Sequence, residues 1–213
     1  MYIPAHFSAS EAEVQELLAH LGAADLITST SLGLLATFLP LLYDKPASRP
    51  GTGELGSLVG HVARANPQWR EEAIGEAMVI VRGPDGYISP SWYPSKQEHG
   101  RVVPTWNYVT AHIHGRLVIH DDPEWVGGLV RRLTDVHEGN RAAPWSVDDA
   151  PEEFIAAQLR AIVGVEIVIS RIEAKYKLSQ NRPEIDFTGV LKGLDETGHA
   201  PLAEAMRKTG RTD

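Results

Sequence analysis

Residues 87–108 hold the side chains best suited to binding a flat, phosphorylated ligand. The segment combines two of the five tryptophans with tyrosines, serine hydroxyls and a single lysine. These residues are Tyr87, Ser89, Ser91, Trp92, Tyr93, Ser95, Lys96, Trp106 and Tyr108. Aromatic rings provide a stacking surface, while hydroxyls and an ammonium group form charge-assisted hydrogen bonds to phosphate oxygens. The set indicates a site for a planar ring that carries a phosphate.

A purely structural interpretation of this segment is equally open. Aromatic residues are common in strands, and Trp- and Tyr-rich strands often form a barrel core or a dimer interface. Pro90, Pro94 and Pro104 disfavour a regular central strand and favour an irregular backbone. The polar loop at residues 97–101 predicts a hairpin-like or crossover connection that brings the two aromatic clusters together.

Composition limits the classes of function. With 213 residues, 43% of them hydrophobic and 23% charged, the chain is typical of one large globular domain. It has no cysteine, which excludes thiol catalysis and disulfides. Neither a signal peptide nor a membrane span is evident, so we expect a cytoplasmic protein. The formal net charge of −8 has the wrong sign for a chain whose main task is to bind a polyanion.

The elements that must position these residues are mostly strands. Periodicity and turn signals predict strands at residues 26–30, 34–43, 55–65, 77–82, 87–92, 109–120 and 163–172. A turn is expected at residues 83–86. Helices are expected at residues 8–21, 122–138, 151–162 and 200–208, the last one exposed. About seven strands without alternating strand–helix units favour an antiparallel barrel with flanking helices.

Other chemistries find little support in the sequence. No GxGxxG segment directly follows a strand, and neither the nucleotide motif GxxxxGK[ST] nor the nucleophile motif GxSxG occurs. His112 and His114 lie two residues apart on one strand face, but no third ligand completes a metal site, and a solvated face or an interface is favoured. The donor-rich segment KLSQNR, which follows the strongest strand, is a candidate second arm of the site.

Five motifs, in order along the chain, carry a family resemblance. MYIPAHF, GHVARANPQW, YISPSWYPSK, VPTWNY and KLSQNR resemble the PaiB family, described as FMN-binding negative transcriptional regulators, from residue 1 to about 194. The resemblance implies a mainly β protein with flanking helices, an antiparallel six-stranded split β-barrel that dimerises and holds FMN at the dimer interface. It also implies an FMN-binding domain at residues 1–194, with a helical insertion at about 122–162 and a helical tail at 195–213.

The resemblance further implies which residues contact the cofactor. In the wider pyridoxamine-phosphate-oxidase-like group, a Ser-x-Lys element grips the FMN phosphate, and Tyr93-Pro94-Ser95-Lys96 is similar to it. The other implied contacts are Ser89 and Ser91 at the ribityl chain or ring, Trp106, Asn107 and Tyr108 beside the ring, and Lys177, Ser179, Gln180 and Arg182 closing over it. The resemblance assigns no catalytic residue and no metal ligand.

Two classes of function remain open at this point. One is an FMN-binding flavoprotein of the PaiB type, either a redox-linked regulator or an oxidoreductase with a small-molecule substrate. The alternative is a transcriptional repressor that acts on DNA directly or through a partner. Because the chain is acidic and has no helix-turn-helix, basic arm or zinc finger, its sequence offers no evident means of reading DNA.

Overall fold

The computed structural model describes residues 1–49 and 51–209. They fall into two compact units, each considered by itself below. Unit 1 comprises Met1–Val14, Arg82–Ala111 and the segment that starts at Glu173; unit 2 comprises Gln15–Val81 and His112–Ile172. Among these residues, no helix has both the length and the apolar character needed to cross a membrane.

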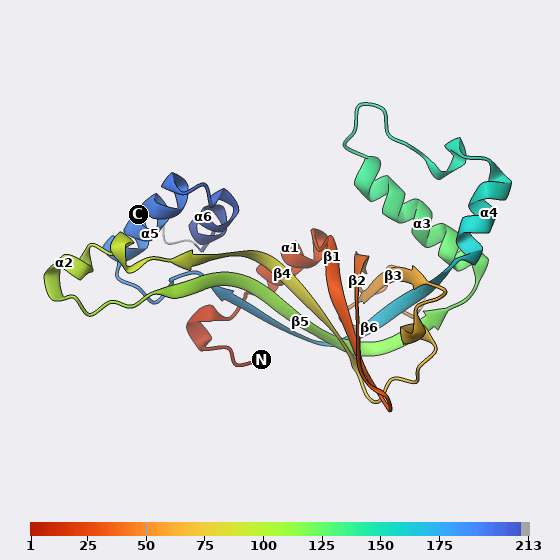
Figure 1. The fold of residues 1–213 in the computed structure, drawn as a ribbon, viewed down its shortest axis with the longest axis horizontal. Helices are drawn as coiled ribbons and strands as arrows, with labels where there is room; N and C mark the ends of the chain where they lie inside the picture. Colours follow the sequence, from red (N-terminus) through yellow and green to blue (C-terminus); the bar gives the residue numbers. More distant parts are fainter. Residues whose placement is uncertain (50, 210–213) are drawn as a thin grey trace. The chain divides into compact units, whose positions relative to one another are not determined.

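Six strands carry the fold. They are β1 (Ala23–Thr30), β2 (Gly33–Asp44), β3 (Ser57–Ala63), β4 (Ala77–Ile88), β5 (Thr105–His120) and β6 (Ile162–Lys177). Neighbouring strands are hydrogen-bonded in the order β1-β2-β3-β6-β5-β4, and β4 pairs back onto β1 (Figure 1). The pairs β1–β2, β2–β3, β3–β6 and β1–β4 are antiparallel. The expected antiparallel six-stranded fold with flanking helices is confirmed.

The β1–β2 hairpin forms at the predicted place. Thr30 pairs with Gly33, its hydroxyl donates to the Gly33 carbonyl at 2.9 Å, and Gly33 has a φ of 113° that favours glycine. Along β2 the side chains alternate, so that Leu39 and Leu41 are buried while Leu34 and Phe38 are 75% and 70% exposed. Leu34 and Phe38 therefore form an apolar strip on the outer face of β2 that is exposed within residues 1–49 and 51–209.

Helices α3 (Pro123–Glu138) and α4 (Glu152–Arg160) of unit 2 form where helices were expected, at residues 122–138 and 151–162. The carboxylate of Asp122 accepts hydrogen bonds from the first turn of α3, as its position before Pro123 predicts. Leu129 and Leu133 of α3 pack against Val59 of β3. An apolar helix face thus covers a strand that is buried along most of its length.

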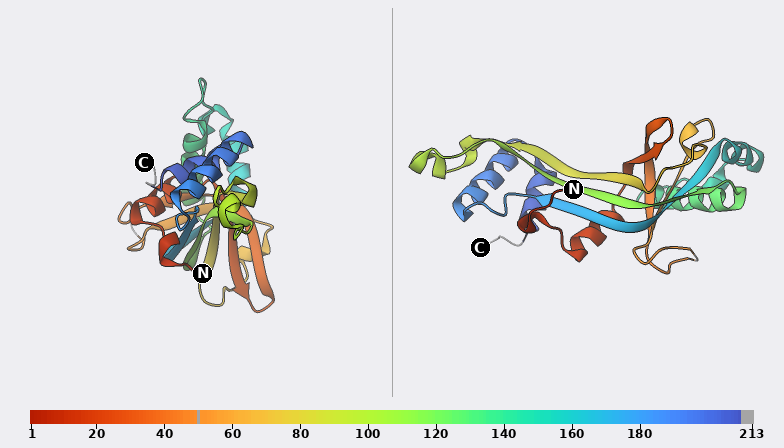
Figure 2. Two further views of the ribbon diagram at one scale, coloured as in Figure 1. Left: turned by 90° about the vertical axis from the view of Figure 1, so that its left-hand side faces the viewer. Right: turned by 90° about the horizontal axis from the view of Figure 1, so that it is seen from below.

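Unit 1 contains two helices that lie side by side, α5 (Glu184–Glu196) and α6 (Ala200–Arg207), in blue in Figures 1 and 2. Helix α5 was not predicted from the sequence, although Phe187, Val190 and Leu194 recur at helical spacing and are buried. Helix α6 was expected to be exposed, but Leu202 and Met206 are fully buried. Both helices therefore contribute to the core of unit 1.

The predicted turn at residues 83–86 is wrong, because β4 runs through it without a break. Gly83 lies against β5, where an added Cβ would come within 2.8 Å of Val109 Cβ. Glycine is thus used here for close strand approach rather than for a turn. The two strands expected on either side are one strand, which reduces seven predicted strands to six.

The remaining elements are short. Helix α1 (Glu11–Ala19) begins after Ser10, which exchanges hydrogen bonds with Glu13 in the manner of a capping box. Helix α2 (Ser95–His99) ends at Gly100, whose φ of 65° is left-handed. The 3₁₀ turns are η1 (Ala5–Phe7), η2 (Pro67–Trp69), η3 (Pro90–Trp92) and η4 (Val147–Asp149).

Candidate functional site

All twelve residues expected to contact a cofactor lie in unit 1. Ser95 begins α2, and both its backbone N–H and its hydroxyl donate to the carboxylate of Asp186 on α5, at 3.1 and 2.7 Å. Both residues are buried. The structure thus gives Ser95 an internal carboxylate as partner at the position where the resemblance implies a phosphate. Lys96 is exposed on α2.

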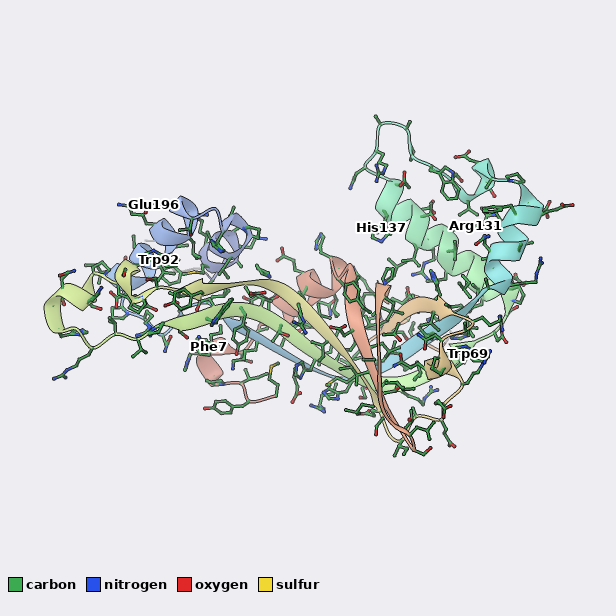
Figure 3. All side chains as sticks on the ribbon, in the orientation of Figure 1. Phe7, Trp69, Trp92, Arg131, His137 and Glu196 are labelled. Carbon is green, nitrogen blue, oxygen red and sulfur yellow. The ribbon has the colours of Figure 1, made fainter. Side chains whose placement is uncertain are left out.

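Helix α5 is shaped to receive η3. Added Cβ atoms at Gly189 and Gly193 would collide with the Trp92 carbonyl and the Trp92 ring, respectively. Figure 3 shows Trp92 beside this helix. Ser89 caps η3 by accepting a hydrogen bond from the Ser91 N–H at 3.2 Å. Much of the YISPSWYPSK motif therefore serves to dock α5.

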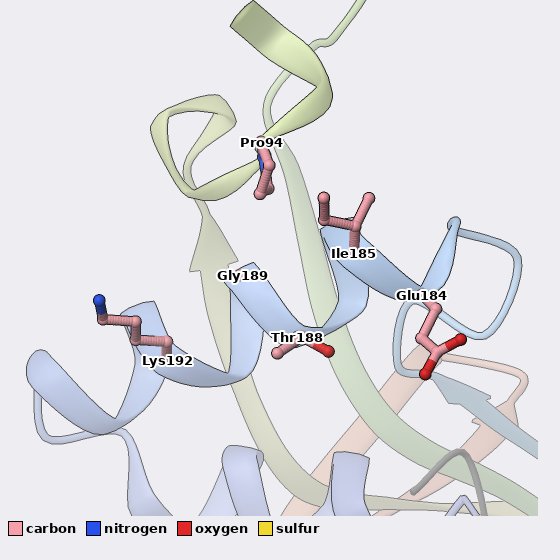
Figure 4. Close-up of a pocket in the computed structure, with 6 residues that line it drawn as sticks. All are labelled: Pro94, Glu184, Ile185, Thr188, Gly189 and Lys192. Atoms are coloured by element: carbon pink, nitrogen blue, oxygen red, sulfur yellow. The ribbon is translucent and has the colours of Figure 1, made fainter. Parts of the chain in front are cut away.

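An open groove of about 540 Å³ runs along the outside of the same contact (Figure 4). Its lining residues are Pro94, Glu184, Ile185, Thr188, Gly189 and Lys192. None of the twelve expected residues lines it. The expected contact residues therefore lie elsewhere in unit 1.

An aromatic surface with lysines lies on the strands of unit 1. The rings of Tyr87 on β4 and Trp106 on β5 meet edge to face, with centroids 6.3 Å apart, yet they are 47% and 54% exposed. Tyr108 follows Trp106 by two residues, so it shares that face of β5. The Nζ atoms of Lys175 and Lys177 lie 5.5 and 5.9 Å from the Tyr108 ring centroid. This surface, defined by these five residues, we call the aromatic face.

A small polar pocket of about 110 Å³ lies where β5 begins and β6 ends. Its lining residues are Phe7, Thr105, Asn107, Lys177, Ser179, Asn181 and Arg182. Lys177 Nζ donates to Thr105 Oγ1 at 2.6 Å and to the Trp106 carbonyl. The Asn107 amide donates to Ser179 Oγ at 2.9 Å, and both side chains are buried. We call this the polar pocket.

Ser179 is held in an uncommon backbone conformation. Its φ of 65° lies in the left-handed region, although it is not a glycine. Such strain persists only where the surroundings enforce it, and here the bond to Asn107 does so. The KLSQNR motif therefore turns sharply at the polar pocket. Gln180 fixes the same turn by bonding the Tyr176 carbonyl and the Leu178 N–H, at 2.6 and 2.8 Å.

The polar pocket is lined by two cationic side chains, Lys177 and Arg182, and by no acidic one. Burial lowers the pKa of Lys177, and the neighbouring charges of Lys175 and Arg182 lower it further. The guanidinium of Arg182 lies 4.9 Å from the ring centroid of Tyr93. Burial raises the pKa of the Tyr93 hydroxyl, an effect that Arg182 opposes. A bound anion would relieve the repulsion among these cations.

Four residues that line the polar pocket were expected from the sequence to contact a cofactor: Asn107, Lys177, Ser179 and Arg182. Phe7 and Thr105, which also line it, and the nearby Lys175 were not singled out, and Asn181 was named only as part of the KLSQNR segment. A signal for Lys175 was available, since it precedes Lys177 by two residues on a strand and so shares its face. The contribution of Phe7 depends on chain topology, which no local pattern reveals.

In unit 2, the GHVARANPQW motif has structural tasks. Arg64 donates to the carboxylate of Asp121 at 2.5 and 3.0 Å and to the carbonyls of Arg160 and Ile162. Asn66 caps η2, and Trp69, labelled in Figure 3, donates its ring N–H to the Arg64 carbonyl at 3.0 Å. The motif ties β3 to the ends of the helical insertion.

A buried ionic cluster also lies in unit 2. Arg49 bridges the carboxylates of Asp44 and Glu166 at 2.7 and 2.5 Å. His120 contacts Glu166 at 2.8 Å and stacks on Trp125 with centroids 3.9 Å apart. Burial alone would raise the pKa of Glu166, but the hydrogen bonds, led by that from Arg49, outweigh it and hold this pKa below its usual range. These contacts fasten the loop after β2 to β6.

His112 and His114 lie on β5 in unit 2. Within residues 1–49 and 51–209, no group of three or more histidine, cysteine or acidic side chains is placed to hold a metal ion.

Comparison with known proteins places these features in a family. Residues 1–171 match the family described as "Putative FMN-binding domain". The chain is 34% identical to "Protease synthase and sporulation protein PAI 2" of Bacillus subtilis strain 168, over 97% of this chain and 94% of that protein.

Solved structures share the fold at low identity. The FAD and heme binding protein from Mycobacterium smegmatis aligns with a TM-score of 0.53 and 18% identity, covering 80% of this chain and 72% of that one. The flavocytochrome Anf3 from Azotobacter vinelandii gives 0.52 and 13%, covering 78% and 67%.

Proposed function

The chain belongs to the FMN-binding family that includes the Bacillus subtilis PAI 2 protein, and we propose that it is a flavoprotein whose FMN ring binds on the aromatic face. The observation that carries this proposal is the exposed, edge-to-face pair of Tyr87 and Trp106 beside Lys175 and Lys177. Exposed rings on a sheet face beside cations are suited to a planar ligand that carries negative charge.

The residues present fit FMN in chemistry as well as in exposure. Trp106 and Tyr108 offer stacking surface, while the amide of Asn107 and the hydroxyl of Ser179 offer polar contacts at the adjoining pocket. When bound, the flavin would supply the redox chemistry, and the protein would bind it, orient it and control its access to water. Ser89, Ser91, Tyr93, Ser95, Lys96 and Gln180 belong to the wider set of contacts that the family resemblance implies.

A substitution on the aromatic face tests this proposal. Trp106→Ala should weaken FMN binding by about 1 to 3 kcal/mol, the range for loss of an aromatic stacking partner. Trp145→Ala is the matched control, because Trp145 is 47% exposed but lies in unit 2. Equal FMN affinity of the two variants would place the ring elsewhere.

We further propose that the protein is a homodimer that buries the outer face of β2. Leu34 and Phe38 stand on that face, with Leu32 in the adjoining turn 79% exposed. An exposed apolar strip favours association. In a two-fold symmetric dimer, the strip of each subunit would pack against the same strip of the other. Light scattering should give twice the 23.3 kDa of the chain, and Phe38→Lys should shift the protein toward monomer. A wild-type monomer at micromolar concentration contradicts the proposal.

The role of the flavin is proposed as redox-linked, in an oxidoreductase or in a regulator that responds to flavin state. Repulsion by a net charge of −8 should keep direct DNA affinity weaker than the range of about 10⁻⁴ to 10⁻⁶ M typical of nonspecific binding. Anisotropy titrations with promoter DNA, at several salt concentrations and with or without FMN, decide between the classes. Submicromolar binding that survives competitor DNA would favour the repressor.

A further inference from the structure

The polar pocket has the composition of an oxyanion site. Two of its lining side chains are cationic, Lys177 and Arg182, and none is acidic. Asn107 and Ser179, with exposed fractions of 1% and 4%, place polar side chains against it. Lys177 and Arg182 are partly buried. Asp186, whose carboxylate accepts two hydrogen bonds from Ser95, does not line the polar pocket.

We propose that the polar pocket binds a phosphate monoester group through Lys177 and Arg182, with Asn107 and Ser179 fixing its orientation. The proposal deepens the proposed function, because FMN carries such a group and riboflavin does not. It assigns the phosphate to the end of β6 rather than to Ser95-Lys96.

The size of the polar pocket supports a phosphoryl group and not a ring system. A cavity of about 150 Å³ is large enough for benzene, so a pocket of about 110 Å³ excludes a three-ring isoalloxazine. The ring would therefore remain on the aromatic face. Lys177 belongs to both surfaces, since its Nζ lies 5.9 Å from the Tyr108 ring centroid.

The lowered pKa of Lys177 agrees with this assignment. Its depression reflects burial and two neighbouring cations, and a dianion would offset both effects. Arg182 adds a planar group with several N–H donors, which suits two oxygens of one phosphate. By contrast, the hydroxyl of Ser95 already donates to a carboxylate, whose negative charge would repel a phosphate.

The phosphate could come from the cofactor itself or from a separate small ligand, and one set of titrations distinguishes them. FMN, riboflavin and inorganic phosphate are each titrated into the full-length apo protein. If the cofactor supplies the group, FMN binds roughly 10- to 100-fold more tightly than riboflavin. Inorganic phosphate then competes with FMN but not with riboflavin.

Variants locate the effect. Lys177→Met and Arg182→Gln should each remove most of the preference for FMN over riboflavin. Lys192→Met removes an equally positive but exposed charge of unit 1 and should leave the preference intact. Thermal unfolding of each variant shows whether it is folded. If one variant fails to fold, the other still tests the inference.

The outcomes separate this inference from the proposed function. If FMN and riboflavin bind equally, or if Lys96→Met alone removes the preference, the inference is overturned while flavin binding stands. If neither flavin binds, the proposed function fails. In that case, a thermal stabilisation by inorganic phosphate that Lys177→Met abolishes supports a separate phosphate ligand in the pocket, and no stabilisation overturns the inference as well.

Discussion

The hydroxyl of Ser95 donates to Asp186 Oδ2 at 2.7 Å, and the Ser95 N–H reaches Oδ1 of the same carboxylate. The Asp186 carboxylate of α5 thus accepts two hydrogen bonds from Ser95 in the first turn of α2. Because the bond joins a hydroxyl to a charged group in a buried place, Ser95→Ala should lower the free energy of unfolding by about 1.5 to 3 kcal/mol. Urea unfolding measures this change. A loss of FMN affinity with unchanged stability would instead favour a phosphate at Ser95.

Replacement of Gly193 by alanine should loosen the contact between α5 and η3. The new methyl group would collide with the Trp92 ring, so we expect a destabilisation of about 1 to 3 kcal/mol. Gly128→Ala is the control, because Gly128 lies in α3 with nothing within 4 Å of the added Cβ and should gain up to about 1 kcal/mol. Equal unfolding midpoints for the two variants would contradict the packing.

Local signals predicted much of the fold because they agree with it. The β1–β2 hairpin joins the strands expected at residues 26–30 and 34–43, and α3 matches the helix expected at residues 122–138. Glycine was the ambiguous residue. Gly83 permits close approach of strands, whereas the same pattern of Gly83 with Pro84 is also typical of a turn.

The candidate site was harder to predict than the fold. Lys177 and Asn107 could be found because they lie in donor-rich motifs. The partnership of Ser95 with Asp186 could not, since it joins residues 91 positions apart and depends on α5, a helix that was not predicted from the sequence. The similarity of Ser95-Lys96 to a phosphate-binding element concerns a local pattern only. The contact that Ser95 makes depends on Asp186, a carboxylate distant in the sequence.

Acid should weaken the fold through Glu166. Its folded pKa is lowered, so its contribution is fully present above the ordinary value of 4.5 and is lost as pH falls through the folded pKa. Glu166→Gln should cost about 3 kcal/mol at neutral pH, because Arg49 and His120 lose their charged partner. The variant should also show a shallower loss of stability below pH 4.5. Parallel pH profiles for both proteins would argue against this role.

Lys177 should affect the free energy of unfolding at alkaline pH. Its folded pKa lies below the ordinary 10.5, so between these two values the unfolded chain binds more protons and the folded state gains stability as pH rises. The stability of the wild type relative to Lys177→Met should therefore increase toward pH 10.5. Phosphate or FMN should reduce this slope. If wild type and Lys177→Met show the same dependence of stability on pH, burial does not lower the pKa of Lys177.

Equilibrium binding of FMN to the apo protein tests the central claim most directly. Quenching of flavin fluorescence, followed as wild-type protein is added, should saturate at micromolar concentration or below with one FMN per chain. The same titration with Trp106→Ala should give clearly weaker binding. Absence of saturable binding by the folded wild-type protein at micromolar FMN would contradict the account.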